Sequence, residues 1–276
     1  MRAIDLVPLL LSCVAVACNG MPGLDTPRVS LSPRLHLDRQ HGRATMQSLQ
    51  GTTIVDNPSQ SVDAFGQTNG DEDWSLVVRA GDGFSGLEGE YRDVAIADSV
   101  LGSLTSDFGR LSDGDGVDAR LTMDTWRVAY FGEIASHRID PESADALELR
   151  LAVGAALSYR EARFSLVQAG GGGLSQTLHV EDRGSPWLGL GGRVAWRDAS
   201  LDLDWLVNPD LSLGGNFDGI QHDVEVMARY RFPDQDVTAL AGYRWSQLDA
   251  SGSENGLRFD TDFSVAAIVL GIEFEF

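Results

Sequence analysis

The sequence predicts an all-β fold, an antiparallel up-and-down β-barrel that spans a membrane with eight to ten strands. Two observations lead to this prediction: a series of segments that alternate between apolar and charged residues, and a regular alternation of short and long links between them. Side chains of a strand point to opposite faces in turn, so each segment has one apolar and one charged face. Lipid outside and a polar lumen inside would suit both faces.

Eight alternating segments follow one another from about Arg120 onward. They cover residues 126–130, 147–159, 162–166, 188–196, 201–207, 220–232, 237–245 and 266–276. Their non-apolar faces carry ions of both signs, which a soluble core would exclude. We predict that these ions pair across a narrow lumen as a charge network of Glu148, Arg150, Arg193, Arg197, Asp202, Asp204, Asp223, Glu225, Arg229, Arg231, Arg244 and Glu273. A two-sheet sandwich with these charges in water is the alternative.

The carboxyl terminus is the most informative stretch of the chain. Phe276, Phe274, Ile272 and Leu270 share one face of the last segment, and the chain stops on an aromatic residue. The pattern Gly271-x-x-Phe274-x-Phe276 resembles the sorting signal of bacterial outer-membrane β-barrel proteins. Val269 departs from it, because that signal usually has a polar residue two positions before its glycine. The resemblance implies residence in the outer membrane, contact with its lipid and recognition by the barrel assembly machinery.

The links between the segments favour the same family. Short links at Arg160-Glu161, at Asp198 and at 233–236 alternate with long polar links at 136–145, 170–185, 208–218 and 249–260. In bacterial outer-membrane barrels the short turns lie on the periplasmic side and the long loops outside. If Phe276 ends at the periplasmic rim, every short link falls on that side. Aromatic residues near the segment ends are typical of interfacial girdles.

The amino terminus predicts export. Residues 1–17 have one basic residue and then an apolar run that is too short to span a bilayer, as in a secretory signal peptide. Ala15-Val16-Ala17 is a cleavage site of the A-x-A type, and Cys18 follows it. This stretch resembles a lipobox, although Ala15 stands where such boxes usually have Leu, and we expect lipid on Cys18. A plain signal peptide that happens to precede a cysteine is the alternative.

The segment that follows predicts no folded structure. Residues 18–73 contain scattered polar residues, Gly and Pro without a sustained period, and such a segment buries too little apolar surface to offset its ordering entropy. We expect a disordered tether there and the barrel over residues 74–276. The chain's two cysteines, Cys13 and Cys18, both precede the barrel, so no disulfide is expected within it.

Two further strands are expected at the start of the barrel. Residues 74–80 and 87–91 have opposite parity around Gly81-Asp82-Gly83, which is a good hairpin turn. They raise the count from eight to ten. One long strand with a glycine bulge, or eight strands with an appendage, are the alternatives. We choose ten, because closed bacterial barrels have an even number of strands.

The search for chemistry is mostly negative. The net charge of −20 argues against binding to nucleic acid and against binding anionic lipid by charge, since both need basic patches. We place His36 and His41 in the tether, His137 and His179 in outer loops, and His222 on the apolar face, so no histidine is expected beside a lumenal serine as a barrel hydrolase requires. The segment 113–118 lacks the third oxygen position and the distal Glu of an EF-hand calcium loop, and we predict a turn. The glycines at 170–173 open no helix and predict a loop rather than a phosphate site.

We therefore expect a non-enzymatic barrel without cofactor, metal or known small-molecule ligand, and a monomer. Its role would be structural, surface interaction, or at most a narrow pore for small solutes, since barrels of about eight strands are nearly filled by side chains. A soluble periplasmic β-sandwich binding module and a barrel enzyme that acts on lipid are the alternatives.

Overall fold

The computed structural model describes residues 28–67, 70–97, 100–140, 142, 145–170, 173–209 and 220–276. Within these residues the regular secondary structure is all β. The strands are β1 (Arg28–Met46), β2 (Ser48–Gln50), β3 (Thr53–Val55), β4 (Gln60–Ser61), β5 (Asp71–Gly81), β6 (Gly86–Ala97), β7 (Gly102–Ser103), β8 (Gly116–Ile139), β9 (Leu147–Gln168), β10 (Ser175–Trp196), β11 (Ala199–Asn208), β12 (Gln221–Arg231), β13 (Val237–Glu254) and β14 (Leu257–Glu275). None of the described residues belongs to a helix long and apolar enough to cross a membrane.

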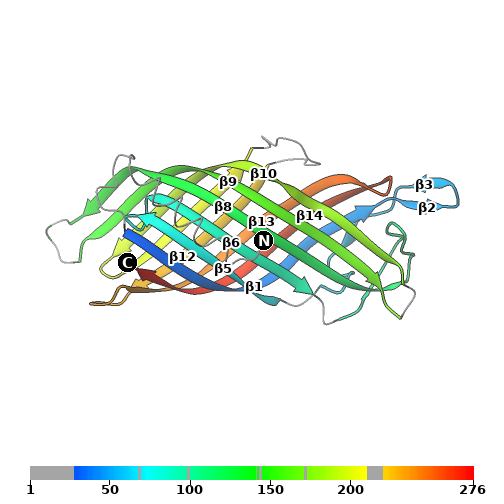
Figure 1. Ribbon diagram of the computed structural model, residues 1–276, viewed down its shortest axis with the longest axis horizontal. Coiled ribbons are helices and arrows are strands. Elements are labelled where there is room, and N and C mark those ends of the chain that lie inside the picture. The colour runs from blue at the N-terminus through cyan, green and yellow to red at the C-terminus, as the bar shows by residue number, and fades with distance from the viewer. Residues whose placement is uncertain are drawn as a thin grey trace.

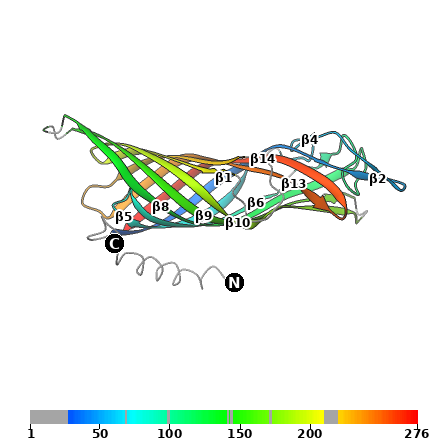
Figure 2. The same ribbon diagram turned by 90° about the horizontal axis from the view of Figure 1, so that it is seen from above.

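Ten of these strands form one closed antiparallel ring. Its order is β1, β5, β6, β8, β9, β10, β11, β12, β13 and β14, and β14 pairs back to β1. The strands are long and tilted, so the barrel is elongated (Figures 1 and 2). The short strands β4 and β7 pair with β1 and β8, and the β2–β3 hairpin stands apart from the ring. The predicted fold class, an antiparallel up-and-down barrel, is confirmed.

The predicted number of ten strands is correct, but the prediction divided one strand into two and omitted another. The segments 147–159 and 162–166 are one continuous strand, β9, and the expected turn at Arg160-Glu161 lies in its middle. The missing strand is β1, which closes the ring by pairing with β5 on one side and β14 on the other. The hairpin expected around Gly81-Asp82-Gly83 is present between β5 and β6.

The disordered tether predicted over residues 18–73 is wrong from Arg28 onward; Cys18 itself lies outside the described residues. In β1 the outward Leu35 and Leu37 are exposed, while the inward His36, Asp38 and Gln40 are almost fully buried. This strand alternates apolar with polar residues like the others. Its low mean hydropathy suggested disorder, yet hydrogen-bonded ladders on both sides satisfy the backbone and offset the ordering entropy.

Two predicted long links are also mostly strand. β13 and β14 meet at Asn255-Gly256, both with positive φ (53° and 80°), which is the conformation that a tight hairpin turn needs. The expected link 249–260 is therefore wrong. Residues 175–185 belong to β10, and the expected link 170–185 shrinks to residues 169–174. The turns at Asp198 and at 233–236 are confirmed.

The side assigned to one predicted loop changes with these corrections. Tracing the antiparallel ladder from Phe276 places the β8–β9 connection, residues 140–146, at the same end of the barrel as the carboxyl terminus. The sequence pattern had assigned it to the opposite end, because splitting β9 in two adds one crossing of the barrel. His137 accordingly lies in β8 rather than in an outer loop, and His179 lies in β10.

The barrel interior away from the carboxyl terminus is a hydrophobic core. Besides ring residues it includes Val62, Phe65, Leu104, Phe108 and Leu111 from two segments that fold inward from the connections β4–β5 and β7–β8. Phe65 packs against Phe108 and Phe164, with ring centroids 5.4 and 5.3 Å apart. We call this cluster the apolar plug. A side chain at Gly102 would collide with the Phe65 backbone, so the packing is tight.

The barrel exterior nearer the carboxyl terminus is an apolar belt. Its exposed residues include Leu35, Val128, Leu157, Leu188, Leu203, Tyr243, Ile268, Leu270 and Ile272. Aromatic residues border it on both sides. The border nearer the carboxyl terminus has Trp196, Tyr230, Phe232, Phe274 and Phe276, and the border nearer the plug has Trp74, Tyr91, Trp126, Tyr159, Trp205 and Trp245. In the second border Tyr91 contacts Trp74 and Trp126, at centroid distances of 5.3 and 4.2 Å.

Candidate functional site

The lumen enclosed by the belt contains a dense network of ion pairs. At its centre Arg244 bonds Asp223 at 2.7 Å and Glu90 at 2.5 Å. Arg127 reaches the same two carboxylates, at 3.4 and 2.9 Å, and Glu88 at 3.0 Å. Buried ions of this kind persist only where their partners are close, and here each arginine is shared by two or more carboxylates.

Most of the predicted network residues lie in this lumen. Those that point inward are Arg193, Asp202, Asp204, Asp223, Glu225, Arg229, Arg244 and Glu273. The other four lie at the mouth near the carboxyl terminus. Arg197 pairs with Asp145 in the turns, Arg231 with Glu275 at 3.4 Å, and Arg150 and Glu148 are 3.8 Å apart. Arg197 and Arg231 line the vestibule at this mouth, and Glu148 lies beside Arg150, so these residues are at the rim of the lumen and not in its buried centre.

Sequence reasoning missed half of the network. Arg34 bonds Glu225 at 2.9 Å, Arg92 bonds Asp38 at 2.5 Å, and Arg160 pairs with Glu181 at 3.4 Å. Arg34 and Asp38 were missed because β1 was interpreted as a tether. Arg160 was missed because it was placed in a turn. The alternation of Leu35 and Leu37 with polar residues was the signal that could have found Arg34 and Asp38.

A serine and a histidine do meet in the lumen, contrary to the prediction. His36 Nε2 lies 2.8 Å from Ser75 Oγ, between β1 and β5, and both side chains are about 1% exposed or less. Their distance would suit nucleophile activation. However, neither residue lines the cavity at the mouth near the carboxyl terminus, and the charges that act on the imidazole are mainly those of arginines, Arg92, Arg244 and Arg34, with one carboxylate, Glu90. A substrate would have to displace the ion network to reach Ser75.

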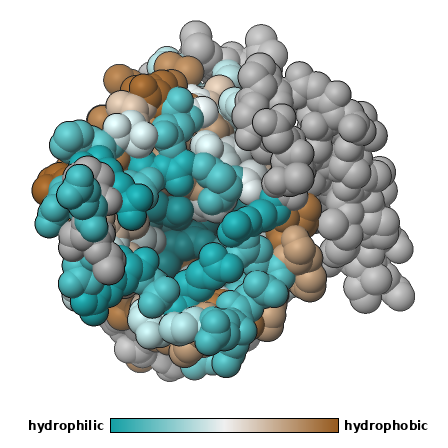
Figure 3. Space-filling model, turned by 90° about the vertical axis from the view of Figure 1, so that its left-hand side faces the viewer, coloured by the Kyte–Doolittle hydropathy of each residue, from teal (hydrophilic) through white to brown (hydrophobic). Residues whose placement is uncertain are grey.

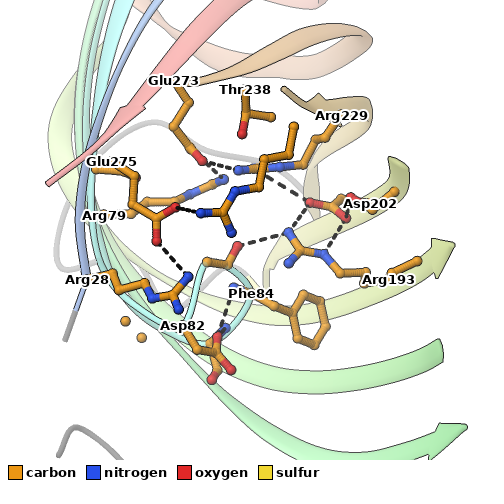
Figure 4. A pocket seen from close by; sticks show the side chains of 18 of the residues that line it. Arg28, Arg79, Asp82, Phe84, Arg193, Asp202, Arg229, Thr238, Glu273 and Glu275 are labelled. Carbon is orange, nitrogen blue, oxygen red and sulfur yellow. Dashed lines mark hydrogen bonds and ion pairs between the residues drawn. The ribbon is translucent and has the colours of Figure 1, made fainter. Parts of the chain in front are cut away.

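A cavity of about 310 Å³ opens at the mouth near the carboxyl terminus. Figure 3 looks into this mouth and shows hydrophilic residues gathered in and around the hollow. In Figure 4, Arg193 and Arg229 share Asp202, and Arg229 also pairs with Glu273. The cavity is therefore a polar vestibule whose charged walls are already paired with each other.

The β5–β6 turn folds into this vestibule. The Phe84 ring lies under the guanidinium groups of Arg150 and Arg193, at 4.8 and 5.1 Å, and Arg193 Nη2 donates to the Gly83 carbonyl at 2.9 Å. Burial alone would raise the pKa of Asp82. Hydrogen bonds from Arg150 and from the backbone N–H groups of Ser85 and Phe84 outweigh it and lower that pKa to about 2. Asp82 is therefore ionised at neutral pH, and its hydrogen bonds hold the turn in place.

The outer face beyond the plug-side aromatic border is acidic. On seven ring strands the first outward charge beyond this border is a carboxylate: Glu72, Asp93, Asp124, Glu161, Asp182, Asp249 and Asp262. We call this set the acidic collar. It is linked to the border, since Tyr91 donates to Asp124 at 3.2 Å and Tyr159 to Asp182 at 2.7 Å. The border and the collar are therefore hydrogen-bonded to each other at two places.

The remaining predicted features have ordinary structural roles. Asp115 lies in a turn, where Oδ2 accepts the Ser112 N–H at 2.8 Å and Oδ1 accepts from Gln168 at 2.9 Å. Among the described residues no group of three or more His, Cys, Asp or Glu side chains is placed to hold a metal ion. Gly170 and Gly173 have positive φ in the β9–β10 connection. His222 contacts Trp205 on the outer face.

Comparison with known proteins finds likeness only among solved structures. No protein-family model and no curated protein matches the chain. It is similar to the outer-membrane protease OmpT of Escherichia coli, with 12% identity over 94% of this chain and 100% of that one and a TM-score of 0.47. The translocator domain of the autotransporter NalP of Neisseria meningitidis has 12% identity, coverage of 99% and 96%, and a TM-score of 0.37. Ail of Yersinia pestis has 12% identity, coverage of 88% of this chain and 98% of that one, and a TM-score of 0.27.

Proposed function

We propose that this protein is a sealed, non-enzymatic barrel of the bacterial outer membrane, which presents its plugged half at the cell surface in a structural or surface-interaction role. The observation that carries the proposal is the apolar belt. Leu157, Leu188 and Ile268 are 70%, 60% and 54% exposed, far more than single scattered surface residues require. A continuous apolar band with aromatic borders, around a polar lumen, is what a lipid bilayer selects.

Two seals argue against a pore. The arginine network fills the lumen inside the belt, and the apolar plug fills the other half. A solute that entered the vestibule would have to separate buried ion pairs and then displace Phe65 and Phe108, which are not exposed at all. Breaking buried pairs costs several kcal/mol each. The structure therefore favours a structural or surface role over the narrow pore that the sequence also allowed.

The same burial argues against catalysis. Ser75 and His36 are the pair whose geometry most favours the alternative of a barrel hydrolase. We propose that Ser75 is structural and that a fluorophosphonate probe will leave it unlabelled. Labelling of the folded protein that disappears in Ser75→Ala would overturn this part of the proposal.

Export and assembly complete the proposal. A signal peptide over residues 1–17 and lipid on Cys18 lie outside the described residues and stay predictions. The first described residue, Arg28, lies at the same rim as Phe276, because the Phe276 N–H bonds the Val29 carbonyl at 2.8 Å. We propose that this rim is periplasmic, that Gly271, Phe274 and Phe276 are read by the barrel assembly machinery, and that the protein is a monomer in contact with outer-membrane lipid.

The test combines location with conductance. The protein is expected in the outer-membrane fraction, with a compact band on gels that shifts on boiling, and it should give no conductance steps in planar bilayers. A variant without Phe276 should assemble poorly, whereas deletion of Gly51, an exposed turn residue of the β2–β3 hairpin, should not matter. Recovery as a soluble periplasmic protein would reject the membrane proposal, and steady conductance would reject the seal.

A further inference from the structure

The acidic collar is interrupted on one strand. On β1 the outward residues beyond Leu37 are Arg39, His41 and Arg43, all three exposed. Among the outward faces that the structure describes, this is the ring strand whose first charge beyond the belt is basic. The chain has 41 acidic residues against 21 basic ones, so a basic column at this level runs against the overall composition.

The two arginines of this column have no carboxylate partner among the residues that the structure describes. Most other described arginines on the barrel walls are engaged, including Arg163 on the outer face of β9, which pairs with Glu161. Arg39 and Arg43 take part in no ion pair or hydrogen bond with the described residues. Arg39 lies opposite Ala266 of β14 in the ladder, and Arg43 lies opposite Asp262 without an ion pair within 4.0 Å.

The column begins just beyond the aromatic border. In the ladder Ala266 of β14 lies opposite Arg39 on one side and Trp245 on the other, so the arginine is two strands away from a border tryptophan. Trp and Tyr rings mark the level of lipid head groups in membrane barrels. The exposed Leu35 and Leu37 continue the same outward face into the belt. A lipid whose acyl chain lies along them has its head group beside Arg39.

We propose that Arg39 and Arg43 bind the phosphate group of an anionic lipid in the outer leaflet, with His41 between them. Guanidinium groups bind phosphate through charge-assisted, often bidentate hydrogen bonds, which carboxylates cannot make. The acidic collar repels anionic head groups from the other strands and leaves β1 as the site where they bind. The inference rests on the proposed function, because it places this face at the outer-leaflet surface.

Binding can be measured with defined lipids. The probe is native mass spectrometry and lipid titration of the full-length barrel in nanodiscs, with phosphatidylglycerol compared against phosphatidylcholine, whose head group carries no net charge. Arg39→Gln should weaken retention of phosphatidylglycerol about fivefold, and the double variant with Arg43→Gln about thirtyfold, since each surface arginine contributes about a factor of five toward anionic lipid. Retention of phosphatidylcholine should not change.

Arg163→Gln is the matched control. It removes an outward arginine from the same half of the barrel, but one that is paired with Glu161. It should leave phosphatidylglycerol retention unchanged. Inorganic phosphate at millimolar concentration should compete if the site recognises phosphate alone and should not compete if the lipid must be embedded in the leaflet. We expect no competition. Competition would show that the site binds soluble phosphate and would overturn the proposal of a lipid ligand.

The outcomes are separable from those of the proposed function. All variants are expected to keep the boiling-dependent gel shift and outer-membrane location, because Arg39 and Arg43 form no ion pair or hydrogen bond with the described residues and Arg163 makes only an exposed ion pair. Equal lipid retention by wild type and the double variant, with the barrel correctly assembled, would reject the head-group site and leave the membrane proposal intact. Failure of the wild type to assemble in nanodiscs would reject both.

Discussion

The two halves of the barrel have opposite insides and outsides, although they are built from the same strands. Along β14 the outward residues change from Leu270 and Ile268 in the belt to Asp262 and Asp260 beyond it. The inward residues change in the reverse sense, from Glu273 to Val265 and Phe263. The parity of the strand never shifts. If the proposed membrane placement holds, what changes is the surrounding phase, lipid in one half and water in the other. Each half then buries the residues that its surroundings exclude.

The lumenal network in the belt half should be the most sensitive point. Arg244→Met removes the cation shared by Asp223 and Glu90 and leaves both carboxylates buried without it. Loss of one partner of a buried ion pair costs about 3–5 kcal/mol. Urea unfolding in lipid vesicles would measure the loss. The triple variant with Asp223→Asn and Glu90→Gln should recover most of it; no recovery would show that the arginine acts through packing instead.

The outward faces offer a direct test of the change of phase. Leu270→Arg places a charge in the belt and should cost about 2–4 kcal/mol near the middle of the bilayer. Asp260→Arg makes the same new side chain on the same face of β14, beyond the collar, and should stay within about 0.5 kcal/mol. Leu270→Ile serves as the conservative control. Equal loss of vesicle-assembled protein from the two arginine variants would contradict the assignment of lipid to one half and water to the other.

The tight turn of the plugged half should show an intermediate effect. Gly256 has φ of 80° with open space around its Cα, so a methyl group there meets strain and no collision. Gly256→Ala should therefore cost about 1 kcal/mol. Gly114, with φ of 81° and equally open surroundings, is a control turn outside the ring. A similar loss of unfolding free energy in Gly256→Ala and Gly114→Ala, measured in the same assay, would show that the cost is local backbone strain. It would also show that the position of Gly256 between two ring strands adds nothing to that cost.

The smallest expected effect is a pH dependence of the collar. Burial and the neighbouring Asp262 raise the pKa of Asp249 from 3.8 to about 6. The folded state therefore binds this proton more tightly than the unfolded state, so its contribution to stability is present below pH 3.8 and is lost as the pH rises through about 6. Wild type should gain thermal stability between pH 7 and 4 relative to Asp249→Asn. Parallel curves for the two proteins would place the titration elsewhere.

Several parts of the fold follow from local patterns. The alternation in β10 to β14 places the belt, and the turn residues at Asp198 and at 233–236 end their strands where the structure has them. Eight of the predicted network residues lie in the lumen for the same reason. The errors arise where a polar composition was interpreted as the absence of a strand. Low hydropathy was interpreted as disorder in β1, and a polar pair, Arg160-Glu161, as a turn in β9.

Alternation along each strand was determined by the sequence alone, because side chains of a strand must point to opposite faces. Which parity faces lipid, and where the two environments exchange, depends on neighbours far away in the chain. Phe65 and Phe108 turn one half of the lumen into a core only when the connections fold inward. His36 meets Ser75, and Arg34 meets Glu225, only because β1 closes the ring between β5 and β14. Closure pairs the two edge strands, β1 and β14, so that every ring strand has a neighbour on both sides, and no local pattern contains that information.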